Sequence, residues 1–192
     1  ADGRIVVNVG FYSEFPKSAR EIENIVKHGA VAFKLFMAEP VGGLDIDDDS
    51  ILLKAFKVVA RLNVPVAVHA EDRTTLGKAK DRLQSTGRND FKAYLRAHSE
   101  RVEVVAIKRL CDIAKKANVH LHICHVTSEK GLRTIAEEKP KMHLTCETTP
   151  HNLFLSTADL TRIGALAVTM PPVRERRHMQ ALWEGIRKRE ID

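Results

Sequence analysis

Three residues that could bind a metal ion lie toward the ends of three apolar segments of the sequence. They are Lys34 in residues 31–37, His69 in residues 64–70 and His125 in residues 120–126. Imidazole nitrogen and carboxylate oxygen are ligands that zinc favours. A lysine ammonium has no lone pair to offer, but a lysine carbamylated by carbon dioxide carries a carboxylate that can bridge two metal ions. These residue types therefore point to metal-assisted hydrolysis.

The apolar segments must be strands if they are to position these residues. Each is short and rich in β-branched residues, and a segment with helical periodicity follows each of them. The expected strands are residues 4–9, 31–37, 64–70, 120–126 and 142–147, with residues 166–169 also extended. The expected helices are residues 18–29, 50–62, 74–84, 91–96, 102–117, 128–138 and 176–189, with a short helical turn from Thr157 to Gly164.

Regular alternation of strand and helix predicts an α/β fold with parallel strands and right-handed crossovers. A complete eight-unit barrel takes about 250 residues. We therefore expect a single domain over residues 1–192 that forms either an open, doubly wound sheet or an incomplete barrel of about five βα units. Active sites of such barrels lie at the carboxyl ends of the strands, so Lys34, His69 and His125 should meet there.

Each candidate ligand also has a structural interpretation when it is taken alone. A lysine in a strand commonly reaches water from an edge, and a strand histidine is commonly hydrogen-bonded within the core. Three such residues at the ends of three strands favour the metal site. Alternate strand residues share a face, which predicts that His120 and His122 point together, away from His125, and are structural. We interpret the remaining histidines outside the site as structural residues without partners: His28, His98, His143 and His178.

Composition narrows the possible function classes. The net charge of +6 comes from 31 basic and 25 acidic residues that are interleaved along the predicted helices. Interleaving predicts a solvated surface and no nucleic-acid partner. Three cysteines without paired spacing predict reduced thiols and a cytoplasmic location. No apolar run approaches the roughly 18 residues that span a bilayer, so we expect no membrane partner.

Four motifs occur in a fixed order along nearly the whole chain. They are Phe-Lys-Leu-Phe at residues 33–36, His-Ala-Glu-Asp at 69–72, His-Ile-Cys-His-Val-Thr-Ser at 122–128 and Glu-Thr-Thr-Pro-His-Asn-Leu at 147–153. With these motifs the sequence resembles the cyclic amidohydrolases, and it is most similar to dihydroorotase. Hydantoinases, dihydropyrimidinases and allantoinases share the same layout.

The resemblance implies a distorted TIM barrel, present here as a partial TIM barrel of about five βα units, with two zinc ions per complete site. It makes Lys34 the carbamylated bridging ligand and assigns His69 and His125 to the second metal. The implied reaction is the hydrolysis of dihydroorotate, a small cyclic amide, to N-carbamoyl-aspartate, with the reverse ring closure in pyrimidine biosynthesis. The residues that the resemblance places near the substrate are Thr149, His151, Asn152, Pro171 and Arg174.

The sequence also departs from the family pattern. The family's first-strand His-x-His pair with its arginine, and its eighth-strand aspartate, have no counterpart here, which predicts a central barrel segment without a catalytic residue and inactive alone. Exposed edge strands then favour self-association or a homo-oligomer. Met170 replaces an asparagine of dihydroorotases, so hydantoinase, dihydropyrimidinase or allantoinase activity is the alternative. A third interpretation is a non-catalytic scaffold protein. The three candidate metal ligands argue against it, because a scaffold has no need for them.

Overall fold

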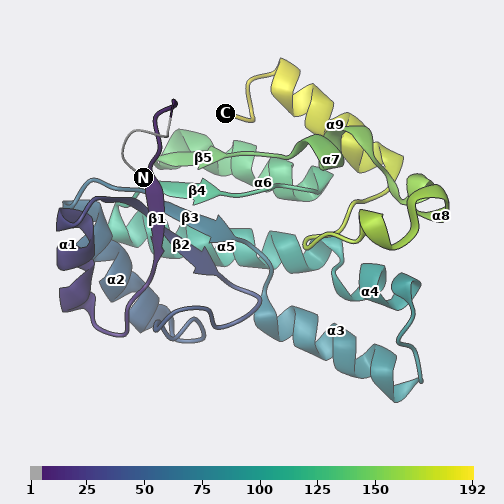
Figure 1. The fold of residues 1–192 in the computed structure, drawn as a ribbon, viewed down its shortest axis with the longest axis horizontal. Helices are drawn as coiled ribbons and strands as arrows, with labels where there is room; N and C mark the ends of the chain where they lie inside the picture. Colours follow the sequence, from purple (N-terminus) through teal and green to yellow (C-terminus); the bar gives the residue numbers. More distant parts are fainter. Residues whose placement is uncertain (1–5) are drawn as a thin grey trace.

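The computed structural model describes residues 6–192, and its centre is a parallel sheet of five strands. The strands follow one another in sequence order across the sheet, and each neighbouring pair is parallel. They are β1 (Phe11–Glu14), β2 (Ala30–Phe36), β3 (Val66–His69), β4 (Leu121–Ile123) and β5 (Leu144–Cys146). Sequential parallel order with intervening helices is the arrangement of a barrel wall. The predicted α/β fold, a partial barrel, is confirmed (Figure 1).

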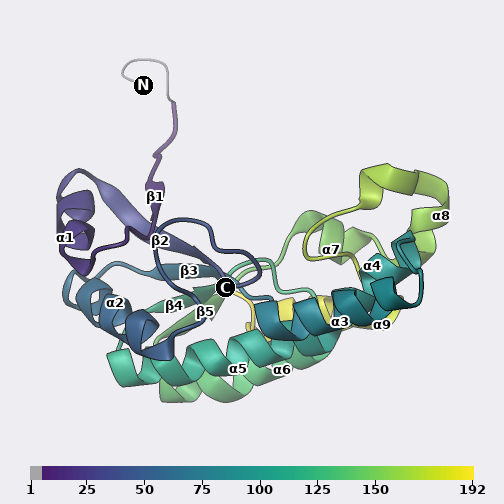
Figure 2. The same cartoon turned by 90° about the horizontal axis from the view of Figure 1, so that it is seen from below.

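The helices form two groups. Along one face of the sheet lie α2 (Asp49–Arg61), α5 (Glu100–Ala117) and α6 (Glu129–Glu138), with α1 (Ala19–Lys27) packed beside α2 (Figure 2). Beyond the carboxyl ends of the strands lie α3 (Arg73–Ser85), α4 (Phe91–Ala97), α7 (Pro150–Phe154), α8 (Leu160–Ile163) and α9 (Arg176–Arg187). Short 3-10 turns cover Lys139–Lys141, Thr157–Asp159 and Gly164–Ala167. The predicted helices therefore occur, including the inserted pair α3 and α4.

Local sequence explains where several helices begin. A serine or aspartate precedes the first turn, and its side chain accepts a backbone N–H that the helix leaves unpaired. These N-cap residues are Ser18, Asp48, Asp72, Asp90 and Ser128. Each such cap stabilises its helix by about 0.5–2 kcal/mol, which is why the helix starts could be predicted closely.

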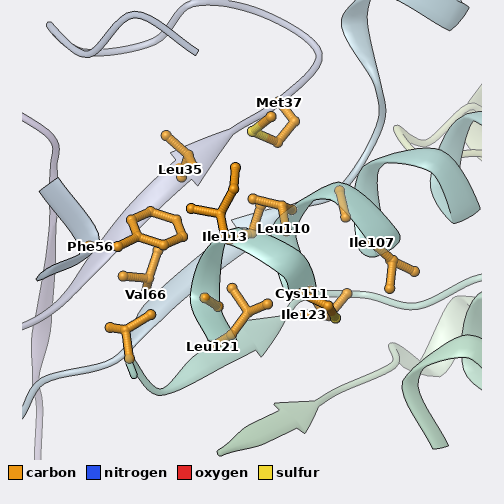
Figure 3. Close-up of a cluster of buried hydrophobic side chains, with 14 of the residues drawn as sticks. Leu35, Met37, Phe56, Val66, Ile107, Leu110, Cys111, Ile113, Leu121 and Ile123 are labelled. Carbon is orange, nitrogen blue, oxygen red and sulfur yellow. The ribbon is translucent and has the colours of Figure 1, made fainter. Parts of the chain in front are cut away.

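Alternation along the strands separates two faces of the sheet. The helix face is apolar and buried, and consists of Phe33, Leu35, Val66, Val68, Leu121, Ile123, Leu144 and Cys146. It packs against Phe56 of α2 and Leu110 of α5 in the main core (Figure 3). The inner face carries Lys34, Phe36, Ala67, His69, His122 and Thr145. The charged and imidazole side chains of the strands lie on this inner face, because the hydrophobic core covers the helix face.

Two strand predictions are wrong. Residues 6–9 of the predicted strand 4–9 are not in a strand, and residues 4 and 5 lie outside the described part of the chain. The first strand is β1, because only there does the backbone pair with β2, whereas Val6 and Val7 are exposed on a segment that leads away from the sheet (Figure 2). Residues 166–169 are not extended, since a 3-10 turn continues to Ala167.

The cysteines are unpaired, as the sequence predicts. Cys111, Cys124 and Cys146 are free and buried. Among the described residues, none of the helices combines the length and apolarity needed to cross a bilayer. The edge strands of the sheet are β1 and β5, so the self-association expected from exposed edges stays a prediction.

A buried histidine in α9 leads to a prediction about pH. His178 Nδ1 accepts the backbone N–H of Glu129 in the first turn of α6 at 3.0 Å. Burial lowers the pKa of His178, and Arg177 lowers it further, although Glu100 acts in the opposite direction. Because the folded-state pKa lies below the unfolded value of about 6.5, the unfolded chain binds more protons as pH falls. The contribution of neutral His178 to the free energy of unfolding is therefore complete above about pH 6.5 and is lost as pH falls below that value.

We therefore expect His178→Gln to reduce the loss of stability between about pH 7 and about pH 5. Urea denaturation at both pH values measures the effect. The control is His28→Gln, at an exposed histidine of α1's C-terminus. Equal pH dependence in His178→Gln and the unmodified chain would contradict the prediction.

Candidate metal centre

Two of the three sequence-predicted ligands meet directly. His69 is the last residue of β3, and His125 follows β4 by two residues with a positive φ of 40°. His69 Nδ1 lies 3.2 Å from His125 Nε2, and the rings meet edge to face with centroids 4.9 Å apart. Two nitrogens bound to one tetrahedral zinc at about 2.0–2.1 Å are about 3.3–3.4 Å apart. The spacing of the two ring nitrogens fits a shared metal ion.

A buried carboxylate orients His69. Glu71 Oε2 lies 3.1 Å from His69 Nε2, and Glu71 Oε1 lies 2.8 Å from His98 Nδ1. All three side chains are almost completely buried. The carboxylate can only accept, so His69 carries its proton on Nε2 and turns a lone pair on Nδ1 toward His125. A histidine oriented by a carboxylate in this way is the usual arrangement at metal sites.

Burial and neighbouring charges set the protonation states. Burial raises the pKa of Glu71, but hydrogen bonds from His69 and His98 outweigh it and hold the pKa at about 2. Burial lowers the pKa of His125 to about 3, with His69 and Lys34 contributing. Glu71 is therefore ionised and His125 is neutral at pH 7. A neutral imidazole is the form that can bind a metal.

Lys34 lies on the inner face beside this pair. Its Nζ is 5.1 Å from the centroid of the Phe36 ring, and Phe36 is in register with His69 with the two rings stacked 5.8 Å apart. Burial raises the pKa of the Cys124 thiol, whereas the positive charge of Lys34 lowers it. The lysine is partly exposed and so is accessible to carbon dioxide.

A second buried carboxylate holds the loop that follows His125. Glu103 of α5 accepts hydrogen bonds from the backbone N–H of Thr127 at 2.9 Å and of Ser128 at 3.0 Å. Both hydroxyls also donate to it, that of Thr127 at 2.8 Å. Arg174 Nε donates to Thr127 Oγ1 at 2.7 Å, and Arg174 Nη1 donates to the carbonyl of His98 at 3.0 Å. This network connects the loops that carry both histidines.

The predicted substrate residues fall into two places. Thr149, His151 and Asn152 form the first turn of α7, where Thr149 Oγ1 lies 3.1 Å from His151 Nε2 and accepts from Asn152 Nδ2 at 2.8 Å. Pro171 and Arg174 lie in the segment between the last 3-10 turn and α9. Of these, Arg174 is connected to the histidine pair, through His98 and Glu71. The side-chain hydrogen bonds of Thr149, His151 and Asn152 run within their own turn.

Several histidine interpretations are corrected by these contacts. The face argument for His125 is wrong, because β4 ends at Ile123 and His125 lies in a loop. His98 has a partner in Glu71, His178 in Glu129, His28 in the carbonyl of Asn24, and His143 stacks on His120 with ring centroids 3.7 Å apart. Glu71 and Glu103 were missed as positioning residues. For Glu71 a signal existed, since it follows His69 by two residues, whereas Glu103 resembles an ordinary charged residue of a helix.

Comparison with known proteins identifies the family. No family model matches the chain. It is 34% identical over 173 residues to allantoinase from Rubrobacter xylanophilus, covering 89% of this chain and 38% of that protein. It is 30% identical over 161 residues to dihydroorotase from Methanosphaera stadtmanae, covering 83% of this chain and 36% of that protein. The structure of L-hydantoinase (dihydropyrimidinase) from Arthrobacter aurescens matches with a TM-score of 0.90 and 30% identity, over 97% of this chain and 42% of that one.

The chain is a homologue of the cyclic amidohydrolases. The resemblance read from the four motifs is thereby confirmed, and so is the barrel type of the fold. The cyclic amidohydrolase relatives are longer, and this chain spans about two fifths of their length. Allantoinases and hydantoinases match the chain as well as dihydroorotase does, so the similarity extends across several cyclic amidohydrolases.

Proposed function

We propose that the protein is a metal-dependent cyclic amidohydrolase in which Lys34, His69 and His125 hold the metal. The observation that carries the proposal is the buried contact between His69 Nδ1 and His125 Nε2 at 3.2 Å, with the other nitrogen of His69 committed to Glu71. Two neutral nitrogen donors and a carboxylate from carbamylated Lys34 would suit zinc. Bound zinc would polarise a ring carbonyl and lower the pKa of water.

The protein's own residues would prepare the site for this chemistry. Glu71 keeps the proton of His69 on Nε2, and Glu103 holds the loop that presents His125. On the substrate side, Asn152 Oδ1 and Arg174 Nη2 are buried and lack a hydrogen-bond partner within the described part of the chain. Unpaired buried polar atoms are costly, so both are suited to bind a polar ligand. Arg174 Nη2 suits a carbonyl or carboxylate oxygen, and Asn152 Oδ1 suits a ring N–H.

Four rings are candidate substrates. The motifs His-Ala-Glu-Asp and Thr-Pro-His-Asn-Leu favour dihydroorotate, whereas the relatives include allantoinase and hydantoinase. Ring opening of dihydroorotate, allantoin, hydantoin and dihydrouracil by the full-length protein that carries this chain would separate them. We expect one of these rings to be hydrolysed at least about tenfold faster than the others, the discrimination that about 1.4 kcal/mol provides. Absence of metal-dependent ring opening with all four would contradict the proposed function.

Zinc content tests the metal site itself. The chain is refolded with zinc and bicarbonate, dialysed and subjected to elemental analysis, beside a Lys34→Ala, His69→Ala, His125→Ala variant. We expect the unmodified chain to retain more zinc than the triple variant, because the variant lacks the proposed ligands. His28→Ala, at an exposed histidine, is the control and should retain as much as the unmodified chain. Equal zinc in the triple variant would show that these residues are not the ligands.

A further inference from the structure

A second group of potential metal ligands lies on the inner face of the sheet. His122 belongs to β4, Cys124 follows β4, and Glu147 follows β5. His122 is in register with Thr145, so Cys124 and Glu147, each two residues further along, lie on the same face. The strand pairing continues past the last assigned residues, since the N–H of Glu147 donates to the carbonyl of Ile123 at 3.0 Å. Two neighbouring strands therefore hold the three side chains together.

The donor atoms of these side chains are close enough for one ion. One ligand atom from each of the three lies within 4.8 Å of the other two, and His122 Nε2 is 3.6 Å from Glu147 Oε2. Cys124 is buried, His122 is partly exposed and Glu147 is exposed. The sulfur atom is therefore shielded from solvent, whereas the other two donor groups are accessible to it. A thiolate, an imidazole and a carboxylate are a ligand set for zinc and related borderline cations, and not for magnesium or calcium.

His122 is held in the orientation that binding needs. Its Nδ1 lies 2.9 Å from Thr145 Oγ1, which also lies 2.8 Å from His120 Nε2. When Nδ1 of His122 donates to Thr145, the lone pair is on Nε2, the nitrogen that faces Glu147. A hydrogen bond to the distant ring nitrogen is what normally fixes a metal-binding histidine. His120 and His122 point together, as alternation along the strand predicts, because both rings contact Thr145 Oγ1.

We propose that His122, Cys124 and Glu147 form a second metal-binding site for zinc or a similar divalent cation. Cys124 binds as a thiolate, so its proton is released to solvent when the ion enters. The site shares no side chain with the His69 and His125 pair, and it does not rest on the proposed function. Lys34 borders both sites, because it lies on the same inner face of the sheet as His69 and His122. When Lys34 is not carbamylated, its positive charge opposes a cation there, which makes the affinity dependent on the charge at position 34.

Cobalt(II) is the probe, because thiolate ligation gives it a charge-transfer band in the near ultraviolet. Titration of the 192-residue chain with cobalt(II) should produce this band. Cys124→Ser should abolish it, while the same change at another buried cysteine, Cys111→Ser, should retain it. The His69→Ala, His125→Ala double variant should also retain it, which separates this site from the proposed catalytic metal. Circular dichroism verifies that each variant is folded.

Two further variants give graded results. Thr145→Val removes the support of His122 with little change in shape and should raise the cobalt Kd by roughly 10–100-fold. Lys34→Met should lower the Kd, because it removes the opposing charge. The proposal is overturned if the unmodified chain gives no thiolate band, if the band survives in Cys124→Ser, or if it disappears in the His69 and His125 double variant. A Kd unchanged by both Glu147→Gln and His122→Ala would likewise overturn it.

Discussion

Glu103→Leu is expected to lower the free energy of unfolding by about 3–5 kcal/mol and to loosen the loop that presents His125. The carboxylate of Glu103 is buried and accepts from two backbone N–H groups and two hydroxyls of Thr127 and Ser128. Leucine has nearly the same volume but cannot accept. The hydroxyls can turn to other acceptors, whereas each buried backbone N–H left unpaired costs about 1–3 kcal/mol.

Urea denaturation of the two proteins measures this difference. Glu137→Leu is the matched control, since it makes the same chemical change at an exposed position of α6 and should stay within about 0.5 kcal/mol of the unmodified chain. A loss below about 1 kcal/mol in Glu103→Leu would mean that the four hydrogen bonds are not what stabilises this loop. Zinc retention should fall in parallel, because Thr127 is only two residues from His125 in the chain.

Glu71→Gln is expected to weaken zinc binding at the His69 and His125 pair by roughly 10–100-fold, an effect that rests on the proposed function. The glutamine amide has one accepting oxygen and one donating nitrogen, whereas Glu71 now accepts from both His69 and His98. If the amide nitrogen faces His69, the proton of that ring must move to Nδ1. The nitrogen that faces His125 then has no lone pair for a metal.

A chelator competition assay measures the zinc Kd of this variant. Asp72→Asn is the matched control, because it makes the same change one residue later at the N-cap of α3, and asparagine caps a helix as well as aspartate does. Nitrogen-15 NMR of the histidine rings adds a readout of the tautomer, which should change in Glu71→Gln and not in Asp72→Asn. Unchanged zinc affinity together with an unchanged tautomer would exclude the orienting role of Glu71.

The carboxylates of Glu71 and Glu103 position the same pair of histidines, each through a different contact. Glu71 determines which nitrogen of His69 faces His125, and Glu103 determines where the loop after β4 places His125. Arg174 connects them, through the carbonyl of His98 on one side and Thr127 on the other. A change at either carboxylate should therefore alter metal binding, but only Glu103→Leu should strongly lower stability without altering the tautomer of His69.

The order of elements and the position of the three candidate ligands at strand ends could be predicted from the sequence. These features depend on short-range physics, namely alternation in strands, the 3.6-residue period of helices and N-cap residues such as Asp48 and Ser128. The register between β2 and β3 then places Lys34 and His69 on one face of the sheet. The resemblance to the cyclic amidohydrolases could also be predicted from the sequence, through its four ordered motifs.

Only the tertiary structure determined which way the side chains at the ends of the short strands point. β4 stops at Ile123, so the direction of His125 depends on a left-handed backbone and on Glu103, more than 20 residues away in the sequence. The partnership of Glu71 with His98, and the meeting of Cys124 with Glu147, likewise join separate segments. Periodicity describes side-chain direction only while the ladder of hydrogen bonds continues, and past its last bond long-range contacts determine which atoms face one another.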